Sequence, residues 1–347
     1  MVQETRAAPA RDGSLGQMPK RMIPLHTAAL HFTMKVLRPT LPNPMKSPVQ
    51  SVRHLFAVSG MALLLLAAGC SATKTTESAV KIGKADELAL QGLQQFFKEK
   101  DAPGALKLLQ KAVDSAPQRN DILWLYFELC AQVLDCSTEV TEARMQKLDP
   151  ENGAVQLGAL ARAQREEDSE AETAVLEAIS RSPIFKIYWN SLISKLARVA
   201  AQDRKRPQPI TRSLNEITDW YSTLASATFG PILVACRANT AATDQVATAR
   251  CMRIAGLLLR GDTYIGESVG FSLAERLLGR EQAQKIAERS AASKYARDVA
   301  SEIINAQLDR EKLSGQLLEL MGKLPREQDV FLAIVQWGGR SEAPAER

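Results

Sequence analysis

Three prolines spaced 33 residues apart constrain the fold of this chain more than any other feature. Pro117, Pro150 and Pro183 each follow a segment whose apolar residues recur three and four positions apart. That spacing predicts helices. A proline ends a helix because it has no N–H to donate and its ring clashes with the preceding turn. Residues 86–183 are therefore expected to form repeated helical units of about 33 residues.

Small residues recur at fixed distances before the first and third of these prolines. Ala105 and Ala112 lie 12 and 5 residues before the first proline, and Ala171 and Ala178 keep the same distances from the third. Larger residues take these places in the middle unit. We expect the alanines to let paired helices pack closely. Residues 169–172 (Ser-Glu-Ala-Glu) form a capping box, which predicts the start of the last helix.

The pattern resembles the tetratricopeptide repeat, a helix–turn–helix unit of about 34 residues. Phe96 matches the aromatic position of the first helix of that repeat, although the Trp-Leu-Gly-Tyr signature of the same helix is missing. The resemblance implies a short α-solenoid over residues 85–202, whose concave face would suit a bound peptide or protein. The alternative is generic antiparallel helix pairs with a coincidental proline spacing.

A second α-helical domain is expected at residues 210–338. The linker before it, residues 203–209, carries charges and two prolines, which mark a boundary. No sustained alternation of apolar and polar residues predicts a strand, so we expect an all-α protein. The tail at 339–347 is expected to be disordered. Helices are predicted at residues 210–228, 243–260, 264–278, from 281 onward, and 327–337.

The amino-terminal part of the chain contains an apolar run, Leu55–Gly69, that follows Lys46 and Arg53 and ends at Cys70. The run has about 15 residues, short of the ~20 that a membrane-spanning helix needs. Positive charge, a short apolar run and small residues in this order are typical of an export signal. Residues 45–69 resemble a bacterial lipoprotein signal, because Ala-Ala-Gly-Cys at its end fits the lipobox.

That resemblance implies that Cys70 becomes the first residue of the mature protein and carries lipid, palmitate included. Ser71 after it implies the outer membrane, with the protein facing the periplasm. The alternative is a short uncleaved anchor with an incidental cysteine. Residues 70–84 are small and polar and are expected to act as a tether. We expect translation to begin at Met45, with residues 1–44 a misassigned start or a disordered extension.

The net charge of +5 comes from this amino-terminal part, because residues 1–70 have a net charge of +6 and the rest of the chain has −1. Eight of the 44 basic residues and two of the 39 acidic ones precede residue 71, which leaves 36 basic and 37 acidic residues after it. A nucleic-acid-binding protein needs a basic surface. We therefore expect no nucleic-acid partner.

Four cysteines remain once Cys70 is assigned to lipid. They are Cys130, Cys136, Cys236 and Cys251. An exported protein meets an oxidising compartment, so two disulfides are expected, and sequence proximity favours Cys130–Cys136 with Cys236–Cys251. Buried free thiols are the alternative. The spacing does not fit a zinc site and the mature chain has no His, so we expect no metal or other cofactor.

The string Gly-Glu-Ser-Val-Gly at residues 266–270 matches the motif of serine hydrolases. That chemistry needs a strand-to-helix elbow and a His, and all three histidines precede residue 71. We expect the glycines to allow close helix packing instead. The pair Glu267-Ser268 resembles the Glu-Ser of soluble lytic transglycosylases, which implies an alternative function: murein cleavage with Glu267 as the catalytic acid.

The favoured hypothesis is a binding protein and not an enzyme. Helical repeats held at the membrane through Cys70 are typical of a protein-interaction scaffold or assembly factor, whose partner is an unidentified envelope protein or peptide. By residue type alone, Phe96, Tyr126 and Trp189 are the candidate contacts with that partner.

Overall fold

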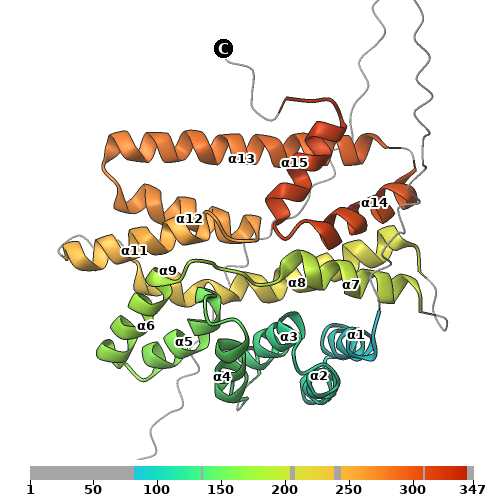
Figure 1. Cartoon of the computed structure of the whole chain (residues 1–347), viewed down its shortest axis with the longest axis horizontal. Coiled ribbons are helices and arrows are strands. Elements are labelled where there is room, and N and C mark those ends of the chain that lie inside the picture. Colours follow the sequence, from blue (N-terminus) through green and yellow to red (C-terminus); the bar gives the residue numbers. More distant parts are fainter. Residues whose placement is uncertain (1–81, 134–135, 204–207, 238–243, 308, 342–347) are drawn as a thin grey trace, which may run out of the picture. The chain divides into compact units, whose positions relative to one another are not determined.

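The computed structural model describes residues 82–133, 136–203, 208–237, 244–307 and 309–341 (Figure 1). The predicted signal, Cys70, all of the tether before Ile82 and the chain beyond residue 341 lie outside the described residues. The described part is all-α and contains no β-strand, which confirms the predicted fold class. It belongs to one compact unit, Lys74–Arg347.

The first half of this unit contains α1 (Lys84–Phe97), α2 (Ala102–Ser115), α3 (Asn120–Ala131), α4 (Glu139–Leu148), the short 3-10 helix η1 (Gly153–Gln156), α5 (Leu157–Arg165) and α6 (Ser169–Arg181). The second half contains α7 (Trp189–Ala201), α8 (Ile210–Thr228), α9 (Gly230–Ala235), α11 (Gln245–Leu258), α12 (Tyr264–Leu277), α13 (Arg280–Ala306), α14 (Arg310–Lys323) and α15 (Glu327–Trp337).

Helices α1 to α6 form three consecutive antiparallel pairs, α1 with α2, α3 with α4, and α5 with α6. The second helix of each pair ends at Ser115, Leu148 and Arg181, so the ends are 33 residues apart and two residues before each proline. The residue before a proline is driven out of the helical region of backbone space. The prolines therefore end the helices where the sequence predicts.

The predicted close packing of the alanines holds in the first pair only. Ala105 and Ala112 of α2 are fully buried, and a Cβ placed on Gly92 of α1 would lie 3.2 Å from the Ala105 carbonyl oxygen. In α6, by contrast, Ala171 is partly exposed and Ala178 is exposed. The prediction is wrong for α6 because Leu176, Ile179 and Ser180 form its buried face instead.

Hydrogen bonds between residues 33 or 34 positions apart connect successive units. The guanidinium of Arg119, ahead of α3, donates to the buried carboxylate of Asp86 in α1 at 2.8 Å. One unit later, the buried Asn152 accepts from the backbone N–H of Lys186 and donates to the carbonyl of that residue, both at 2.9 Å. These bonds fix the register of each unit against the next.

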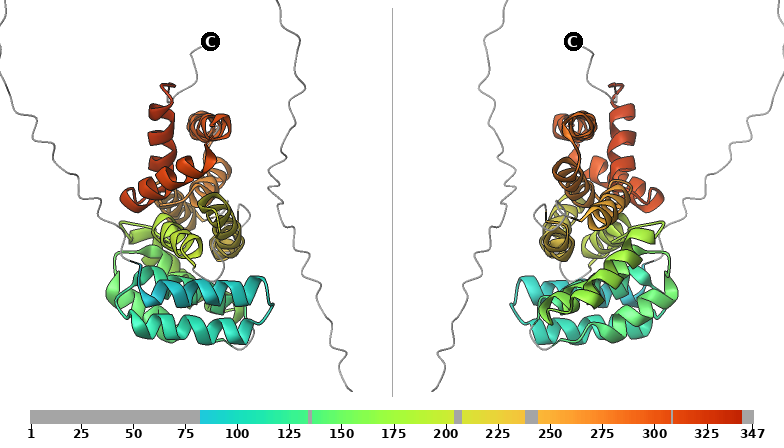
Figure 2. Two further views of the ribbon diagram at one scale, coloured as in Figure 1. Left: turned by 90° about the vertical axis from the view of Figure 1, so that its right-hand side faces the viewer. Right: turned by 90° about the vertical axis from the view of Figure 1, so that its left-hand side faces the viewer.

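Helices α7 to α9 cover the first helix of each pair. Helix α1 packs against α7, α3 against both α7 and α8, and α5 against α9. Figures 1 and 2 show the pairs on one side of α7 and α8, with α12 to α15 on the other. The face that a solenoid would offer to a partner is thus filled by the chain's own helices.

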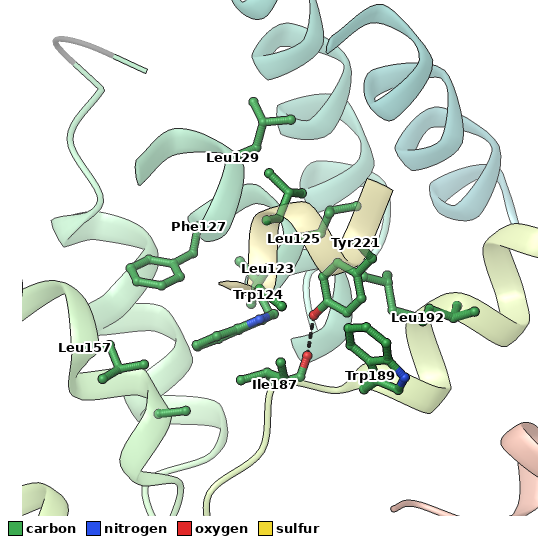
Figure 3. Packing of buried hydrophobic residues seen from close by; sticks show 14 of the residues in the cluster. Leu123, Trp124, Leu125, Phe127, Leu129, Leu157, Ile187, Trp189, Leu192 and Tyr221 are labelled. Atoms are coloured by element: carbon green, nitrogen blue, oxygen red, sulfur yellow. Dashed lines mark hydrogen bonds between the residues drawn. The ribbon is translucent and has the colours of Figure 1, made fainter. Parts of the chain in front are cut away.

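Side chains of α3, α7 and α8 meet within the main hydrophobic core (Figure 3). Trp124 of α3 and Tyr221 of α8 are fully buried, and the ring of Trp189 of α7 packs against Tyr221 in a tilted geometry, with ring centroids 5.1 Å apart. The Tyr221 hydroxyl donates to the carbonyl of Ile187, just before α7. Burying a tyrosine requires such a partner for its hydroxyl.

One hydrophobic core runs from Ala85 of α1 to Leu318 of α14. Residues 203–209 therefore connect two stretches of chain that share this core. A smaller cluster, built around Val299 of α13 and Ile334 of α15, lies at the carboxy-terminal end.

The structure contains the two disulfides that sequence proximity favours. Cys130 is joined to Cys136 between α3 and α4, and Cys236 is joined to Cys251 between α9 and α11. The sulfur atoms are 2.01 and 2.03 Å apart.

Removing the second disulfide is expected to cost more stability than removing the first. The Cys236–Cys251 bridge closes a 15-residue separation, for which loop entropy predicts a loss of about 3 kcal/mol when both cysteines become alanine. The Cys130–Cys136 bridge spans 6 residues, and its double alanine variant should lose about 2 kcal/mol. Urea unfolding measures both. A smaller loss for Cys236→Ala/Cys251→Ala than for the other pair would contradict this expectation.

Candidate partner-binding surface

The three residues predicted to contact a partner lie on three helices and differ in exposure. Trp189 of α7 is 3% exposed and belongs to the central core, so no partner can reach it in this structure. Tyr126 of α3 packs partly buried against the same core. Phe96 of α1 is partly exposed and contacts the aromatic residue next to it.

That contact belongs to an aromatic cluster shared by α1 and α8. The Phe96 and Phe97 rings meet edge to face, with centroids 5.0 Å apart, and Phe97 stacks on Trp220 at 5.6 Å. Lys98 Nζ lies 5.0 Å from the centroid of the Trp220 ring and 2.7 Å from Glu216 Oε1. We call these five residues the α1–α8 aromatic surface.

Local sequence explains each half of this surface. Helix α1 ends at Phe97, so its last turn projects Phe96, Phe97 and the following lysine toward α8. Glu216 and Trp220 are four residues apart, which places them on one face of α8. The three rings are partly buried against the main core, and the Lys98 and Glu216 side chains are 43% and 23% exposed.

An open hollow of about 460 Å³ adjoins the aromatic surface along α8. It is lined by Pro209, Thr211, Arg212, Asn215, Glu216, Asp219 and Trp220. One wall is aromatic, and the others carry a cation, two carboxylates and neutral polar groups. An open site with this mixture suits a protein or peptide better than a small substrate, which needs a deep and largely apolar pocket.

The start of α8 is fixed by α14, which keeps the hollow in shape. Both carboxylate oxygens of Glu311 accept hydrogen bonds, from the backbone N–H of Ile210 at 2.6 Å and of Thr211 at 3.2 Å. The Ile210 N–H is the main cause of a lowered pKa at Glu311. The N-cap residue of α8 is Pro209, whose side chain makes no capping hydrogen bond. The Glu311 carboxylate of α14 takes the place of that cap.

Glu267, the acid of the alternative enzyme hypothesis, lies on α12 facing α13 and α15. Its Oε2 accepts from Ser293 Oγ at 2.8 Å and from Gln328 Nε2 at 3.5 Å. The neighbouring Glu327 accepts from the Tyr264 N–H at 2.7 Å, and loss of hydration raises the pKa of Glu327 to about 7.

Glu267 lines neither the hollow along α8 nor a second hollow at the start of α6. The larger one follows α8, and the other, of about 310 Å³, is lined by Asp168, Glu170, Ala171 and Ala174. Glu267 and Ser268 lie within α12 and not at a strand-to-helix elbow. A Cβ on Gly270 would lie 2.9 Å from the Ala255 carbonyl oxygen, so this glycine lets α12 approach α11, as the sequence predicts.

Two buried acids that the sequence analysis did not single out lie near the centre of the molecule. Glu128 of α3 is 2% exposed; its Oε1 accepts from Thr228 Oγ1 at 2.9 Å, and its Oε2 has no partner. Burial raises the pKa of Glu128 to about 8. Asp262 accepts from the backbone N–H groups of Ile187 and Trp189, yet burial raises its pKa to about 6.

Across the described ranges, His, Cys, Asp and Glu side chains form no group of three or more that could hold a metal ion. No helix there combines the length and the apolar character needed to cross a bilayer.

No protein-family model matches the chain, and neither the curated proteins nor the solved structures include a match.

Proposed function

We propose that this chain is a lipid-anchored cell-envelope protein that works as an interaction scaffold or assembly factor. Cys70 holds it at the membrane, and the α1–α8 aromatic surface with its hollow binds an envelope protein or peptide. The observation that carries the proposal is the arrangement of the aromatic residues. Three rings remain partly exposed beside an open hollow, although α7 to α9 cover the rest of the first-helix face.

The chemistry of the surface favours binding over catalysis. Aromatic rings give large contact areas with little loss of side-chain entropy, and such residues dominate the energetics of protein interfaces. Lys98 and Glu216 flank the Trp220 ring and can form polar contacts at the rim. The acids whose pKa burial raises, Glu128, Asp262 and Glu327, do not line the hollow.

The tether limits where the partner can be. From Cys70 to the start of α1 at Lys84 the chain can reach at most about 50 Å when fully extended. Helix α1 has 14 residues and adds about 20 Å between its start and the aromatic surface. The partner surface is therefore expected within about 70 Å of the membrane, which suits an envelope component.

A photo-crosslinking experiment in intact cells tests the proposal. A photoreactive residue at Asp219, which is exposed and lines the hollow, should give one discrete crosslinked product. The same residue at Gln282, exposed on α13, serves as the control and should give none. Equal products from both positions, or none from Asp219, would contradict binding at this surface.

Trp220→Ala is expected to weaken the crosslink at Asp219 about tenfold or more, because an aromatic anchor at the centre of an interface contributes about 2 kcal/mol. The matched control is Trp337→Ala, which removes a 52% exposed tryptophan from the end of α15. Circular dichroism should show both variants folded. An unchanged crosslink in Trp220→Ala would remove this residue from the proposed interface.

A further inference from the structure

The two disulfides differ in the exposure of their cysteine residues. Cys236 and Cys251 are 1% and 2% exposed and belong to the main core. Cys130 is fully buried in the last turn of α3. Cys136 alone among the four is partly exposed, in the connection between α3 and α4.

Exposure of one sulfur decides whether a disulfide can exchange in the folded protein. A thiolate attacks one sulfur of the bond and displaces the other, so the attacked sulfur must be open to the incoming group. The Cys236–Cys251 bridge offers no such sulfur unless the core opens. The Cys130–Cys136 bridge contains one partly exposed cysteine, Cys136, through which a thiolate can approach.

We propose that Cys130–Cys136 is an exchangeable disulfide with Cys136 Sγ as its point of attack, and that its reaction partner is a dithiol, either a small molecule or a thiol–disulfide exchange protein. The other disulfide stays inert while the protein is folded.

The reaction balances as a two-electron exchange. A thiolate of the dithiol attacks Cys136 Sγ, an intermolecular S–S bond forms, and the Cys130–Cys136 bond breaks. The electron pair goes to Cys130, which takes a proton from water. The second thiol of the dithiol then attacks the dithiol sulfur that is bonded to Cys136. The intermolecular S–S bond breaks, and Cys136 leaves as a thiol. The protein is reduced by two electrons, and the dithiol is oxidised to a disulfide.

The surrounding contacts allow this exchange without unfolding. Glu142 of α4 accepts two hydrogen bonds from the guanidinium of Arg162 in α5, at 2.7 and 2.9 Å, and another from Thr138 Oγ1. The Glu142 side chain is 2% exposed and that of Arg162 is 24% exposed, so the carboxylate side of this ion pair is shielded from solvent. Helix α4 is therefore held in place independently of the disulfide before it.

Partial reduction of the folded full-length protein in detergent tests the proposal. Dithiothreitol is added without denaturant, free thiols are alkylated, and the peptides are identified by mass. Cys130 and Cys136 are expected to be alkylated together, while Cys236 and Cys251 stay bonded until guanidinium is added. Reduction of both bridges at the same rate, or of Cys236–Cys251 first, would overturn the assignment, as would a Cys130–Cys136 bridge that resists the reagent.

Two single-thiol variants identify the sulfur that is attacked. Cys130→Ala leaves a free Cys136 thiol, and Cys136→Ala leaves a free Cys130 thiol, so each is the other's matched control. In native buffer, the Cys136 thiol is expected to react with an aromatic disulfide reagent at least about tenfold faster than the Cys130 thiol. Equal rates, or a faster Cys130, would show that exposure of Cys136 does not govern the exchange.

Discussion

Glu128→Gln is expected to raise the free energy of unfolding near pH 8 by about 4 kcal/mol relative to the wild-type protein, and to change it little near pH 4. The carboxylate of Glu128 is buried on α3, and its pKa is raised from 4.5 to about 8. An unfolded chain has no such burial, so its Glu128 ionises near its ordinary pKa.

The direction of the effect follows from proton binding. Below pH 4.5 both the folded and the unfolded protein carry the proton on Glu128. Between pH 4.5 and about 8 only the folded protein keeps it, so stability falls by about 1.4 kcal/mol for each pH unit. Above that range Glu128 is ionised in both the folded and the unfolded protein. The stability that the neutral folded form provided at low pH is then fully lost, and stability no longer changes with pH because of this group. Glutamine resembles the protonated acid in shape and never ionises, so it removes this slope.

Urea unfolding between pH 4 and pH 9 measures the effect. Asp262 and Glu327 also have raised pKa values, of about 6 and 7, and should give the variant a residual slope at lower pH. Glu275→Gln, which replaces an exposed carboxylate on α12, is the control and should follow the wild-type curve. Parallel curves for Glu128→Gln and wild type between pH 6 and pH 8 would show that Glu128 is ionised in the folded protein.

Helix ends marked by local signals were predictable from the sequence. Helix α8 spans Ile210–Thr228 and α15 spans Glu327–Trp337, as predicted. Pro209 and Gly230 lie within two residues of the ends of α8, and Pro325 and Gly338 lie within two residues of the ends of α15. Two signals were misread. Asp168, and not Ser169, caps α6, and Asp309 starts α14 within what the sequence suggested was one long helix.

Contacts between distant helices were not predictable in this way. Trp189 is buried because Tyr221, on another helix, packs against it, and no residue near Trp189 signals this. The stacking of Phe97 on Trp220 joins residues 123 positions apart. Of these buried features, only that of Glu128 has a signal in the neighbouring sequence. Glu128 is the one acid inside the apolar run from Ile122 to Cys130, where a charge is costly unless it is neutralised.

Cys70→Ser is expected to move the protein almost completely from the membrane fraction to the soluble fraction. Two or more acyl chains on one residue give stable anchoring, because each buried CH₂ contributes about 0.8 kcal/mol. The variant has no lipid attachment site. Its apolar run of about 15 residues is also too short to span a bilayer. Carbonate extraction of membranes followed by immunoblotting measures the distribution.

Ser71→Ala is the matched control for this variant. It changes the neighbouring residue but keeps the lipobox cysteine, so it should remain in the membrane fraction. A membrane-bound Cys70→Ser protein would show that something other than a lipid on this residue anchors the chain.

The mass of the amino-terminal peptide of the protein purified from membranes tests the proposed anchoring most directly. We expect a peptide that begins at Cys70 and carries the added mass of acyl chains. A peptide that begins at Met1 or Met45, or one that contains an unmodified Cys70, would contradict it.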